Sequence, residues 1–323
     1  MVRSRAACFE GPRKVSLKEI ELEPREDQVL VKTFQASICG TDKLYYWGEV
    51  PKEVSLPICP WGHEGGGIVV KVGSKVREFR EGDIVMSFGP GTFADYFLST
   101  APYGCLKAPE GVDVEVACLG EPLACAVHAA KIASKNVCVG DSVAVVGVGF
   151  AGQIILQGLR RGGADVLFAI DKIDFKLDFA KKFGADVTFN VERDNVVKEV
   201  LDLTDGRGVD LVVEASGSGD GLNLASDIVR HNGTIVIYSH YMKPFLANLY
   251  RWHEDALNIV HACLMHHTKE EMVVWAREAF RLVKKNIFNV KPLITKRYSL
   301  SEISDAFENE ILNRNSIKTA IVP

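Results

Sequence analysis

The chain has 323 residues, of which 47% are hydrophobic and 25% are charged, and its formal net charge is −4. This length and composition allow two globular domains, each with its own core. The acidic balance excludes a cationic field for nucleic acid or an anionic membrane surface, so we expect a small-molecule partner. No stretch approaches the roughly 20 apolar residues of a membrane helix, and no signal-type region follows Met1, which predicts a cytoplasmic protein.

The cysteines give no sign of a disulfide framework or of a four-cysteine zinc lobe. None of the eight forms a C-x-x-C pair, and we expect most of them to be buried and reduced. They stand at Cys8, Cys39, Cys59, Cys105, Cys118, Cys125, Cys138 and Cys263.

The first hundred residues are rich in short β-type runs, such as 28–33 and 67–72, separated by Gly, Pro and Asp. From about Glu121 the pattern changes to alternating strands and helices, which predicts a parallel sheet covered by helices. The predicted strands are 142–146, 166–170, 211–214 and 234–239, and the predicted helices are 151–161 and 175–183. The C-terminal part predicts helices at 269–285 and 301–312 and a final strand at 318–322.

A glycine motif follows the apolar strand 142–146 directly. Gly147 permits a tight turn, Gly149 lets the backbone approach a pyrophosphate, and Gly152 allows the next helix to pack closely on the strand. The free N–H groups at the helix start would face the anion. A glycine turn that only joins strand to helix is the alternative, but the surrounding strand and helix favour a dinucleotide site.

Asp171 ends the next predicted strand, about 20 residues beyond the glycines. A carboxylate there would accept hydrogen bonds from an adenosine ribose and would repel a 2′-phosphate. The basic neighbour Lys172 could soften that repulsion. The pattern therefore favours NAD over NADP.

Cys39, His63 and Glu121 offer one thiolate, one imidazole and one carboxylate, which are the ligand types that Zn²⁺ prefers. Their wide separation suits a catalytic site rather than a zinc finger. Glu64 could be a fourth ligand, exchangeable with substrate, or a carboxylate that orients the site. Local sequence alone favours a buried core thiol at Cys39 and an ordinary hydrogen-bonded surface histidine at His63.

Several motifs occur in an order that resembles the zinc-containing medium-chain dehydrogenase/reductase superfamily, in particular its polyol branch with sorbitol and threonine dehydrogenases. The resemblance spans essentially the whole chain. The motifs are A-S-I-C-G-T-D at 36–42, P-W-G-H-E-G-G-G-I-V at 60–69, E-G-D-I-V at 81–85, G-T-F-A-D-Y at 91–96, G-E-P-L-A at 120–124 and K-P-L-I at 291–294.

The resemblance implies an α/β fold with two domains. A GroES-like β-barrel catalytic domain would cover 1–123 and be completed by 264–323, and a Rossmann NAD-binding domain would cover 124–263. It further implies that Cys39 and His63 bind the catalytic zinc, that Glu121 binds it directly or through water, and that Glu64 belongs to the same site. The active site would lie in the cleft between the domains.

Two departures from the family pattern are visible. The segment 83–88 runs almost directly into 91–93, where many relatives insert a lobe with four zinc-binding cysteines, so we expect one catalytic Zn²⁺ and no structural zinc. Leu44 stands where sorbitol and threonine dehydrogenases usually carry a histidine, so the proton path must differ. Thr41 could relay the proton, or it could bond a nearby backbone group.

Aromatic and polar residues could shape the substrate pocket. Tyr45, Tyr46 and Trp47 resemble the aromatic patch of polyol pockets, although a packing role is equally open. His240 and Tyr241 follow a predicted strand and could contact nicotinamide or substrate. Further histidines follow at His253, His261, His266 and His267.

The leading hypothesis is a zinc-dependent oxidoreductase that transfers hydride between NAD and a secondary alcohol of a polyol, cyclitol or sugar acid. The alternative within enzymes is an amino-acid dehydrogenase resembling L-threonine 3-dehydrogenase. A non-catalytic cofactor-binding protein is the alternative from another class. The family also implies a homodimer or homotetramer, in which a strand such as Thr234–Tyr238 could pair across a two-fold axis.

Overall fold

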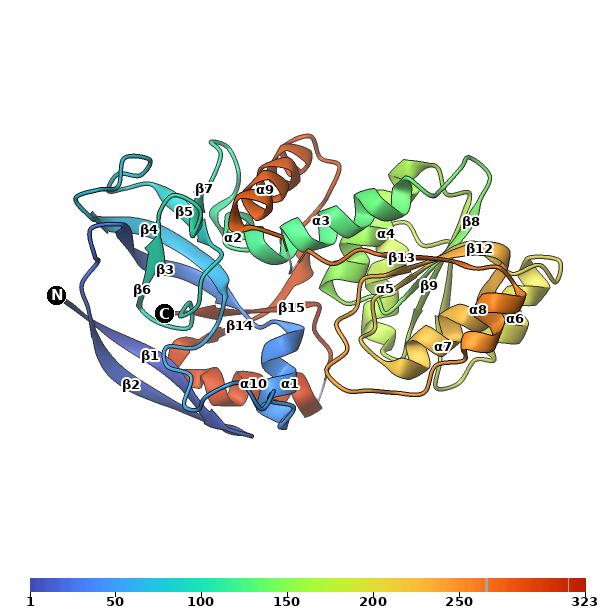
Figure 1. Ribbon diagram of the computed structural model, residues 1–323, viewed down its shortest axis with the longest axis horizontal. Helices are drawn as coiled ribbons and strands as arrows, with labels where there is room; N and C mark the ends of the chain where they lie inside the picture. Colours follow the sequence, from blue (N-terminus) through green and yellow to red (C-terminus); the bar gives the residue numbers. More distant parts are fainter. Residues whose placement is uncertain (265–266, 313) are drawn as a thin grey trace. The chain divides into compact units, whose positions relative to one another are not determined.

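The computed structural model describes residues 1–264, 267–312 and 314–323. The chain forms two compact units (Figure 1). Unit 1 consists of Met1–Ala124 and His267–Pro323, and unit 2 consists of Cys125–His266. Unit 1 therefore contains both ends of the chain, and unit 2 is a continuous insertion into it. No helix among the described residues is long and apolar enough to cross a membrane.

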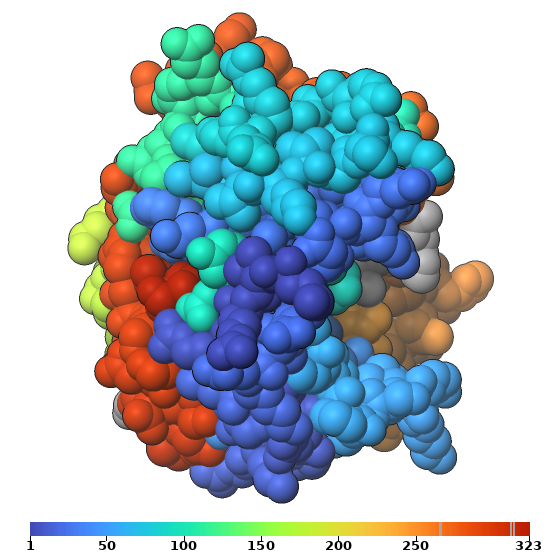
Figure 2. All heavy atoms as spheres, turned by 90° about the vertical axis from the view of Figure 1, so that its left-hand side faces the viewer, coloured from blue at the N-terminus to red at the C-terminus, as the bar shows by residue number. Residues whose placement is uncertain are grey.

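Unit 1 consists mainly of antiparallel strands, as the short β-type runs predicted. Its larger sheet has the order β14-β15-β3-β4-β5-β7, and β6 also pairs with β3. The last strand pairs with β3, so segments from the two ends of the sequence adjoin in Figure 2. The strands are β1 (Val2–Gly11), β2 (Lys14–Leu22), β3 (Gln28–Ser37), β4 (Glu64–Val72), β5 (Ile84–Ser87), β6 (Tyr96–Thr100), β7 (Cys105–Lys107), β14 (Ile294–Ser299) and β15 (Lys318–Val322).

The helices of unit 1 are short in the first part of the chain and longer near its C-terminus. They are α1 (Gly40–Trp47), α2 (Val114–Ala117), α9 (Lys269–Lys284), α10 (Ile303–Leu312) and the 3₁₀ turns η1 (Lys291–Leu293) and η2 (Leu300–Glu302). Helix α3 (Gly120–Ser134) begins in unit 1 and continues into unit 2. The predicted helix at 301–312 is thus a 3₁₀ turn followed by an α-helix.

An aromatic cluster holds the segment that leads to His63. The ring of Trp61 lies 4.9 Å from that of Phe9 and 4.7 Å from that of Phe307, measured between ring centroids. Tyr46 stacks on Phe307 at 5.0 Å and is buried. Burial of such large rings contributes strongly to a core, so the backbone before His63 has a well-defined position.

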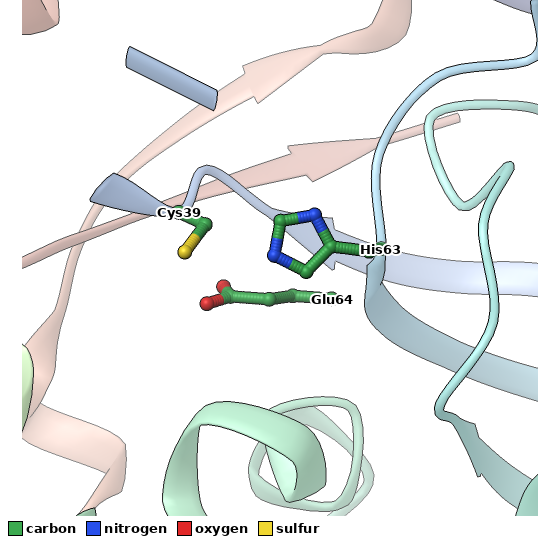
Figure 3. Close-up of side chains that lie close together, drawn as sticks. All are labelled: Cys39, His63 and Glu64. Atoms are coloured by element: carbon green, nitrogen blue, oxygen red, sulfur yellow. The ribbon is translucent and has the colours of Figure 1, made fainter. Parts of the chain in front are cut away.

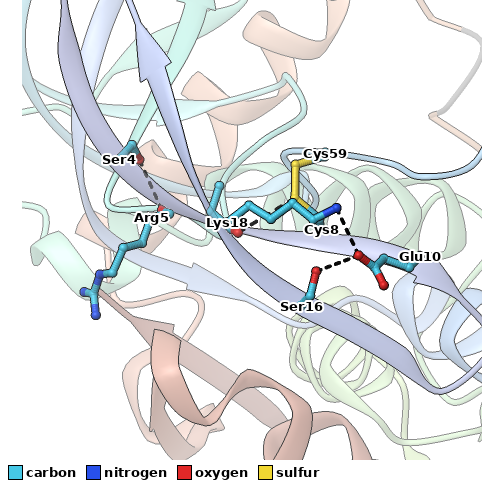
Figure 4. The surroundings of a disulfide bond; sticks show 8 residues. Ser4, Arg5, Cys8, Glu10, Ser16, Lys18 and Cys59 are labelled. Carbon is cyan, nitrogen blue, oxygen red and sulfur yellow. Dashed lines mark hydrogen bonds and ion pairs between the residues drawn. A yellow bond between two sulfur atoms is a disulfide. The ribbon is translucent and has the colours of Figure 1, made fainter.

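The cysteines differ from expectation. Cys8 of β1 and Cys59 form a disulfide, with Cα atoms 4.4 Å apart, next to the Glu10 carboxylate that pairs with Lys18 (Figure 4). The expectation that most cysteines are buried is also wrong, because only Cys8, Cys105 and Cys118 of the eight are buried. The strand contacts explain the pairing: backbone hydrogen bonds join Phe9 to Ile58, which brings their neighbours together.

Unit 2 is a six-stranded parallel sheet with the order β10-β9-β8-β11-β12-β13. In chain order this is 3-2-1-4-5-6, the order of a Rossmann fold, which confirms the predicted fold class. The strands are β8 (Ser142–Val146), β9 (Val166–Asp171), β10 (Val187–Asn190), β11 (Val209–Glu214), β12 (Val229–Ile237) and β13 (Asn258–His261), and the helices are α4 (Phe150–Gly162), α5 (Asp174–Lys182), α6 (Val196–Leu203), α7 (Gly219–Ile228) and α8 (Leu249–Glu254).

The prediction that Thr234–Tyr238 could pair with a second copy of the chain is wrong. Thr234–Ile237 of β12 is hydrogen-bonded on both sides, to β11 and to β13, so it has no free edge. The edges of this sheet are β10 and β13. The four-residue strand β13 covers β12 and was not predicted.

Candidate metal centre and nucleotide site

Helix α1 fixes the position of Cys39, which is its N-cap residue. The Cys39 sulfur accepts a hydrogen bond from the backbone of Asp42, and an Asp42 carboxylate oxygen accepts one from the Cys39 N–H at 3.0 Å. This reciprocal pair is a capping box in which a sulfur takes the place of the usual hydroxyl. The Cys39 thiol, a predicted zinc ligand, is therefore held by the start of a helix.

Cys39, His63 and Glu64 converge although they come from different segments. Their ligand atoms all lie within 4.8 Å of one another (Figure 3). Cys39 follows β3, and Glu64 begins β4, which pairs antiparallel with β3. The sheet register thus brings the ends of the two strands together. A thiolate, an imidazole and a carboxylate at this spacing fit Zn²⁺ by donor type.

Asp42 also contacts the ring of His63. Its Oδ1 lies 3.5 Å from His63 Nδ1, which leaves the other ring nitrogen, Nε2, for a metal. Burial opposes protonation of His63, but the charges of Asp42 and Cys39 outweigh it and raise the pKa of His63 well above its ordinary value. Asp42 therefore orients two of the predicted ligands without being one.

Glu64 is buried and carries an unexpected partner. The Nζ of Lys318 lies 2.7 Å from Glu64 Oε2, and the hydroxyl of Ser37 donates to the same oxygen. Burial alone would raise the pKa of Glu64, but Lys318 and His63 lower it. Sequence reasoning missed Lys318. The available signal was a lysine at the start of a C-terminal strand that has no other charged residue.

Glu121 and Thr41 lie in the first turns of two helices. Glu121 is in the first turn of α3 and is not part of the three-residue cluster, although its charge contributes to the raised pKa of Lys318. Burial opposes that rise, and Glu64 and Cys39 are its larger causes. Thr41 is half-buried in α1, and no hydrogen bond of its hydroxyl is found among the described residues.

The other candidate pocket residues are largely engaged. Tyr46 packs in the core and donates to Glu308 at 2.9 Å, so it has the packing role, while Trp47 is exposed. The Tyr241 hydroxyl donates to the buried carboxylate of Glu214 at the end of β11. His266 lies outside the described residues.

The glycine motif in unit 2 has the geometry of a nucleotide loop. Gly147 has φ +89°, in the left-handed region, and directly follows β8. A Cβ on Gly152 would lie 2.1 Å from the Gly147 carbonyl oxygen, so α4 can approach only without a side chain there. Gly149 is the N-cap of α4, and a Cβ on it would meet nothing within 4 Å. The helix start thus faces open space, as an anion site requires.

Asp171 ends β9 and folds back onto this loop. One carboxylate oxygen accepts a hydrogen bond from Val148 N at 2.9 Å, and the other accepts from Lys172 N at 2.8 Å and Ile173 N at 3.1 Å. An ionised carboxylate has about four acceptor positions. One position therefore stays available to a ribose hydroxyl, and the negative charge lies beside the loop.

Comparison with known proteins gives matches along both units. Residues 25–110 match the alcohol dehydrogenase GroES-like domain, and residues 151–278 match the family described as zinc-binding dehydrogenase. The chain is 30% identical over 310 residues to L-threonine 3-dehydrogenase of Bacillus licheniformis, covering 87% of each protein. It is also 30% identical over 361 residues to D-xylulose reductase A of Aspergillus oryzae, covering 97% of this chain and 95% of that protein.

The fold has a close counterpart among solved structures. A putative zinc-binding dehydrogenase from Sinorhizobium meliloti 1021, bound to NADP, superposes with a TM-score of 0.87 at 24% identity and full coverage of both chains. Together with the two sequence relatives, these matches identify an oxidoreductase that acts on CH–OH groups with a nicotinamide cofactor and zinc. The chain therefore belongs to the polyol branch of the zinc-containing medium-chain dehydrogenase/reductase superfamily.

Proposed function

We propose that the protein oxidises a secondary alcohol of a polyol, cyclitol or sugar acid with NAD, at one catalytic zinc ion per chain, and reduces the corresponding ketone in reverse. The observation that carries this proposal is the convergence of Cys39, His63 and Glu64 ligand atoms within 4.8 Å. The contact of Asp42 with His63 supports it, since a histidine ligand commonly donates a hydrogen bond from its second ring nitrogen to a carboxylate.

Cys39, His63 and Glu121 would hold the metal, and Glu64 would stand beside them. A zinc ion bound there would supply Lewis acidity that polarises an alcohol oxygen, while NAD accepts hydride. Unit 1 positions the ligands for that metal. The helix cap fixes the Cys39 thiol, and the contact of Asp42 with His63 Nδ1 leaves Nε2 on the opposite side of the ring.

Thr41 would move the proton. Its hydroxyl can both donate and accept, as a relay must. The competing role, a hydrogen bond to nearby backbone, has no support among the described residues, where no such bond is found. Leu44 cannot substitute for the histidine of related dehydrogenases, because its side chain has no polar atom that could accept or donate a proton. Thr41 is therefore the candidate for the first proton acceptor.

The cofactor assignment rests on Asp171. Gly147, Gly149 and Gly152 would bind the pyrophosphate by backbone N–H groups, which does not discriminate between NAD and NADP. The Asp171 carboxylate would bind the ribose hydroxyls and repel a 2′-phosphate, which favours NAD. The Sinorhizobium structure holds NADP, so this point needs a direct test.

A threonine dehydrogenase is the second candidate, since the Bacillus licheniformis relative carries that activity in its name. The Aspergillus relative is named as a xylulose reductase, which favours polyols to the same degree. The two substrates differ in charge, because threonine requires sites for an ammonium and a carboxylate group. A panel of substrates separates them without further structural assumptions.

The test is NADH formation across polyols, cyclitols, sugar acids and L-threonine, with protein of known zinc content and a chelator-treated control. We expect zinc-dependent turnover on one of the first three classes. Turnover on threonine alone would favour the second candidate. Bound zinc and NAD without turnover on any compound of the panel would support a non-catalytic cofactor-binding role instead.

A further inference from the structure

Three adjacent strands bring a lysine to the carboxylate of Glu64. In the β3–β4 ladder Ser37 lies directly opposite Glu64, and in the β15–β3 ladder Ala320 lies opposite Ser37. Side chains alternate along a strand, so Lys318, two residues before Ala320, lies on the same face as all three. Sheet register alone therefore places Ser37, Glu64 and Lys318 together.

The pair is buried as well as close. The side chain of Lys318 is 6% exposed and that of Glu64 is 2% exposed. Lys318 Nζ also lies 3.3 Å from the carbonyl oxygen of Ile38. A buried ammonium is costly unless it is paired and hydrogen-bonded, and removing one partner leaves the other charge uncompensated. Each member thus fixes the position of the other.

The side chains of Ser37 and Lys318 bind the same oxygen of the Glu64 carboxylate. Ser37 and Lys318 both donate to Oε2. One oxygen of this carboxylate lies within 4.8 Å of the ligand atoms of Cys39 and His63, so Glu64 is within reach of a metal bound there. Lys318 is the cation paired with that carboxylate.

We propose that Lys318 is a positioning residue that holds Glu64 beside the zinc ion rather than on it, so that one ligand position stays open. This inference rests on the proposed function, because it needs a metal at Cys39 and His63. The buried ion pair supports it. A zinc ion would offset charges of its own ligands, whereas Lys318 is the cation that pairs directly with Glu64.

Loss of Lys318 should redirect Glu64. In a Lys318→Met variant the buried carboxylate has no cation except the metal, so it becomes a zinc ligand and closes the open position. The metal-free variant then carries an uncompensated buried charge. Its thermal stability becomes dependent on zinc far more strongly than that of the parent protein.

The experiment uses Co²⁺ in place of zinc and imidazole as a neutral probe of the open position, so no substrate is needed. We expect Lys318→Met to weaken imidazole binding by about 10- to 100-fold, the usual range for changes behind a metal ligand, and to alter the cobalt absorption spectrum before imidazole is added. Lys318→Arg, which keeps the charge, should behave like the parent protein. Lys107→Met is the matched control. Lys107 also pairs with a buried carboxylate, Asp83 at 2.5 Å, but Asp83 is not a predicted metal ligand.

Two further variants keep the test decisive. Glu64→Gln/Lys318→Met lacks the anionic ligand, so its cobalt spectrum and imidazole affinity should return toward those of the parent. Ser37→Ala removes only the second hydrogen bond to Oε2 and should shift both readouts slightly in the direction of Lys318→Met, which covers the case that Lys318→Met does not fold.

An unchanged imidazole affinity in Lys318→Met, or in Ser37→Ala if only that variant folds, would overturn the role of Lys318. A parent protein that binds no Co²⁺ or Zn²⁺ at Cys39 would instead overturn the proposed function. The two failures are therefore distinguishable from the parent protein alone.

Discussion

Gly149 caps helix α4, Gly152 lies in the first turn of that helix, and the two glycines meet different surroundings. A Cβ at Gly152 would clash with the carbonyl of Gly147, whereas a Cβ at Gly149 would enter open space. The backbone of Gly149 is extended, with φ −68° and ψ −163°, and suits any residue. At the residue scale, the fold explains Gly152, and the proposed pyrophosphate would explain Gly149.

Gly149→Ala should separate folding from cofactor binding. We expect unchanged stability in urea unfolding but an NADH affinity at least about tenfold weaker, which is about 1.4 kcal/mol, because the added methyl group occupies the path of the pyrophosphate. Gly152→Ala is the contrasting variant and should lose about 1–3 kcal/mol of stability through overpacking. If Gly149→Ala bound NADH as the parent protein does, the loop would not be the pyrophosphate site.

Asp171→Asn should shift cofactor preference. The amide oxygen can still accept the hydrogen bond of Val148 N, while the negative charge that repels a 2′-phosphate is gone. We expect the ratio of NADP to NAD affinity to rise about tenfold or more in fluorescence titrations. Asp174→Asn, an exposed carboxylate of the next helix, is the control. An unchanged ratio would show that Asp171 does not contact the ribose.

The residue types of the metal centre were predictable, but their mutual support was not. Thiolate, imidazole and carboxylate with the family motifs indicated Cys39, His63 and Glu121, with Glu64 beside them. The structure brings Cys39, His63 and Glu64 together, and Glu121 is not part of that cluster. Lys318 could not be paired with Glu64 from the sequence, because the pairing depends on the register of β15 against β3. The zinc and catalytic roles of these residues stay predictions.

At the scale of elements, strong hydrophobic runs gave accurate bounds and short ones did not. β8 and β15 have the predicted bounds, because each is a buried run beside clear turn or polar residues. β13 spans only Asn258–His261, which is too short for a recognisable alternation of apolar residues. Because the sequence did not predict β13, β12 was expected at the edge of the sheet. A single short strand therefore changes which surface of unit 2 is free.

Asp210 joins three strands of this sheet and makes their stability depend on pH. It accepts hydrogen bonds from Ser142 N at 2.8 Å and from Arg230 Nε at 2.6 Å. Burial would raise the pKa of Asp210, but Arg230 and Ser142 outweigh it and hold this pKa below the ordinary 3.8. A lowered pKa stabilises the fold above the unfolded value and loses that effect as the pH falls through the folded value.

Asp210→Ala should therefore destabilise the protein by about 2 kcal/mol at pH 7, the range of hydrogen bonds to charged groups, and by less below about pH 3.8. Urea unfolding at pH 7 and pH 3 measures both values. Asp202→Ala removes the exposed pair with Lys198 and should cost less than about 0.5 kcal/mol. An equal loss at both pH values would contradict the role of the Asp210 charge.

At the scale of the whole molecule, the two half-sites belong to different units. The predicted zinc ligands lie in unit 1, and the glycine loop with Asp171 lies in unit 2. Periodicity could show that the chain changes from β to α/β structure, but not that the C-terminal residues rejoin the first unit. That expectation came from the family resemblance, because residues distant in sequence leave no local signal of their contact.

Cys39→Ser should separate the half-sites. We expect loss of bound zinc and of turnover, because a hydroxyl is a much poorer zinc ligand than a thiolate, with NAD affinity changed less than about threefold. Metal analysis and NADH titration of the same preparation measure both effects. Cys138→Ser, which changes an exposed thiol of unit 2, is the control. A zinc-free Cys39→Ser protein with full activity would exclude the zinc mechanism.

The most direct measurement is turnover as a function of bound zinc in the parent protein, with the best substrate of the panel and NAD. Zinc is removed stepwise by a chelator and then restored, and the zinc content and rate are measured at each step. The account predicts a rate proportional to bound zinc, reaching its maximum at about one ion per chain and recovering when zinc returns. A rate that persists in zinc-free protein would contradict the assignment of Cys39 and His63 to a catalytic metal.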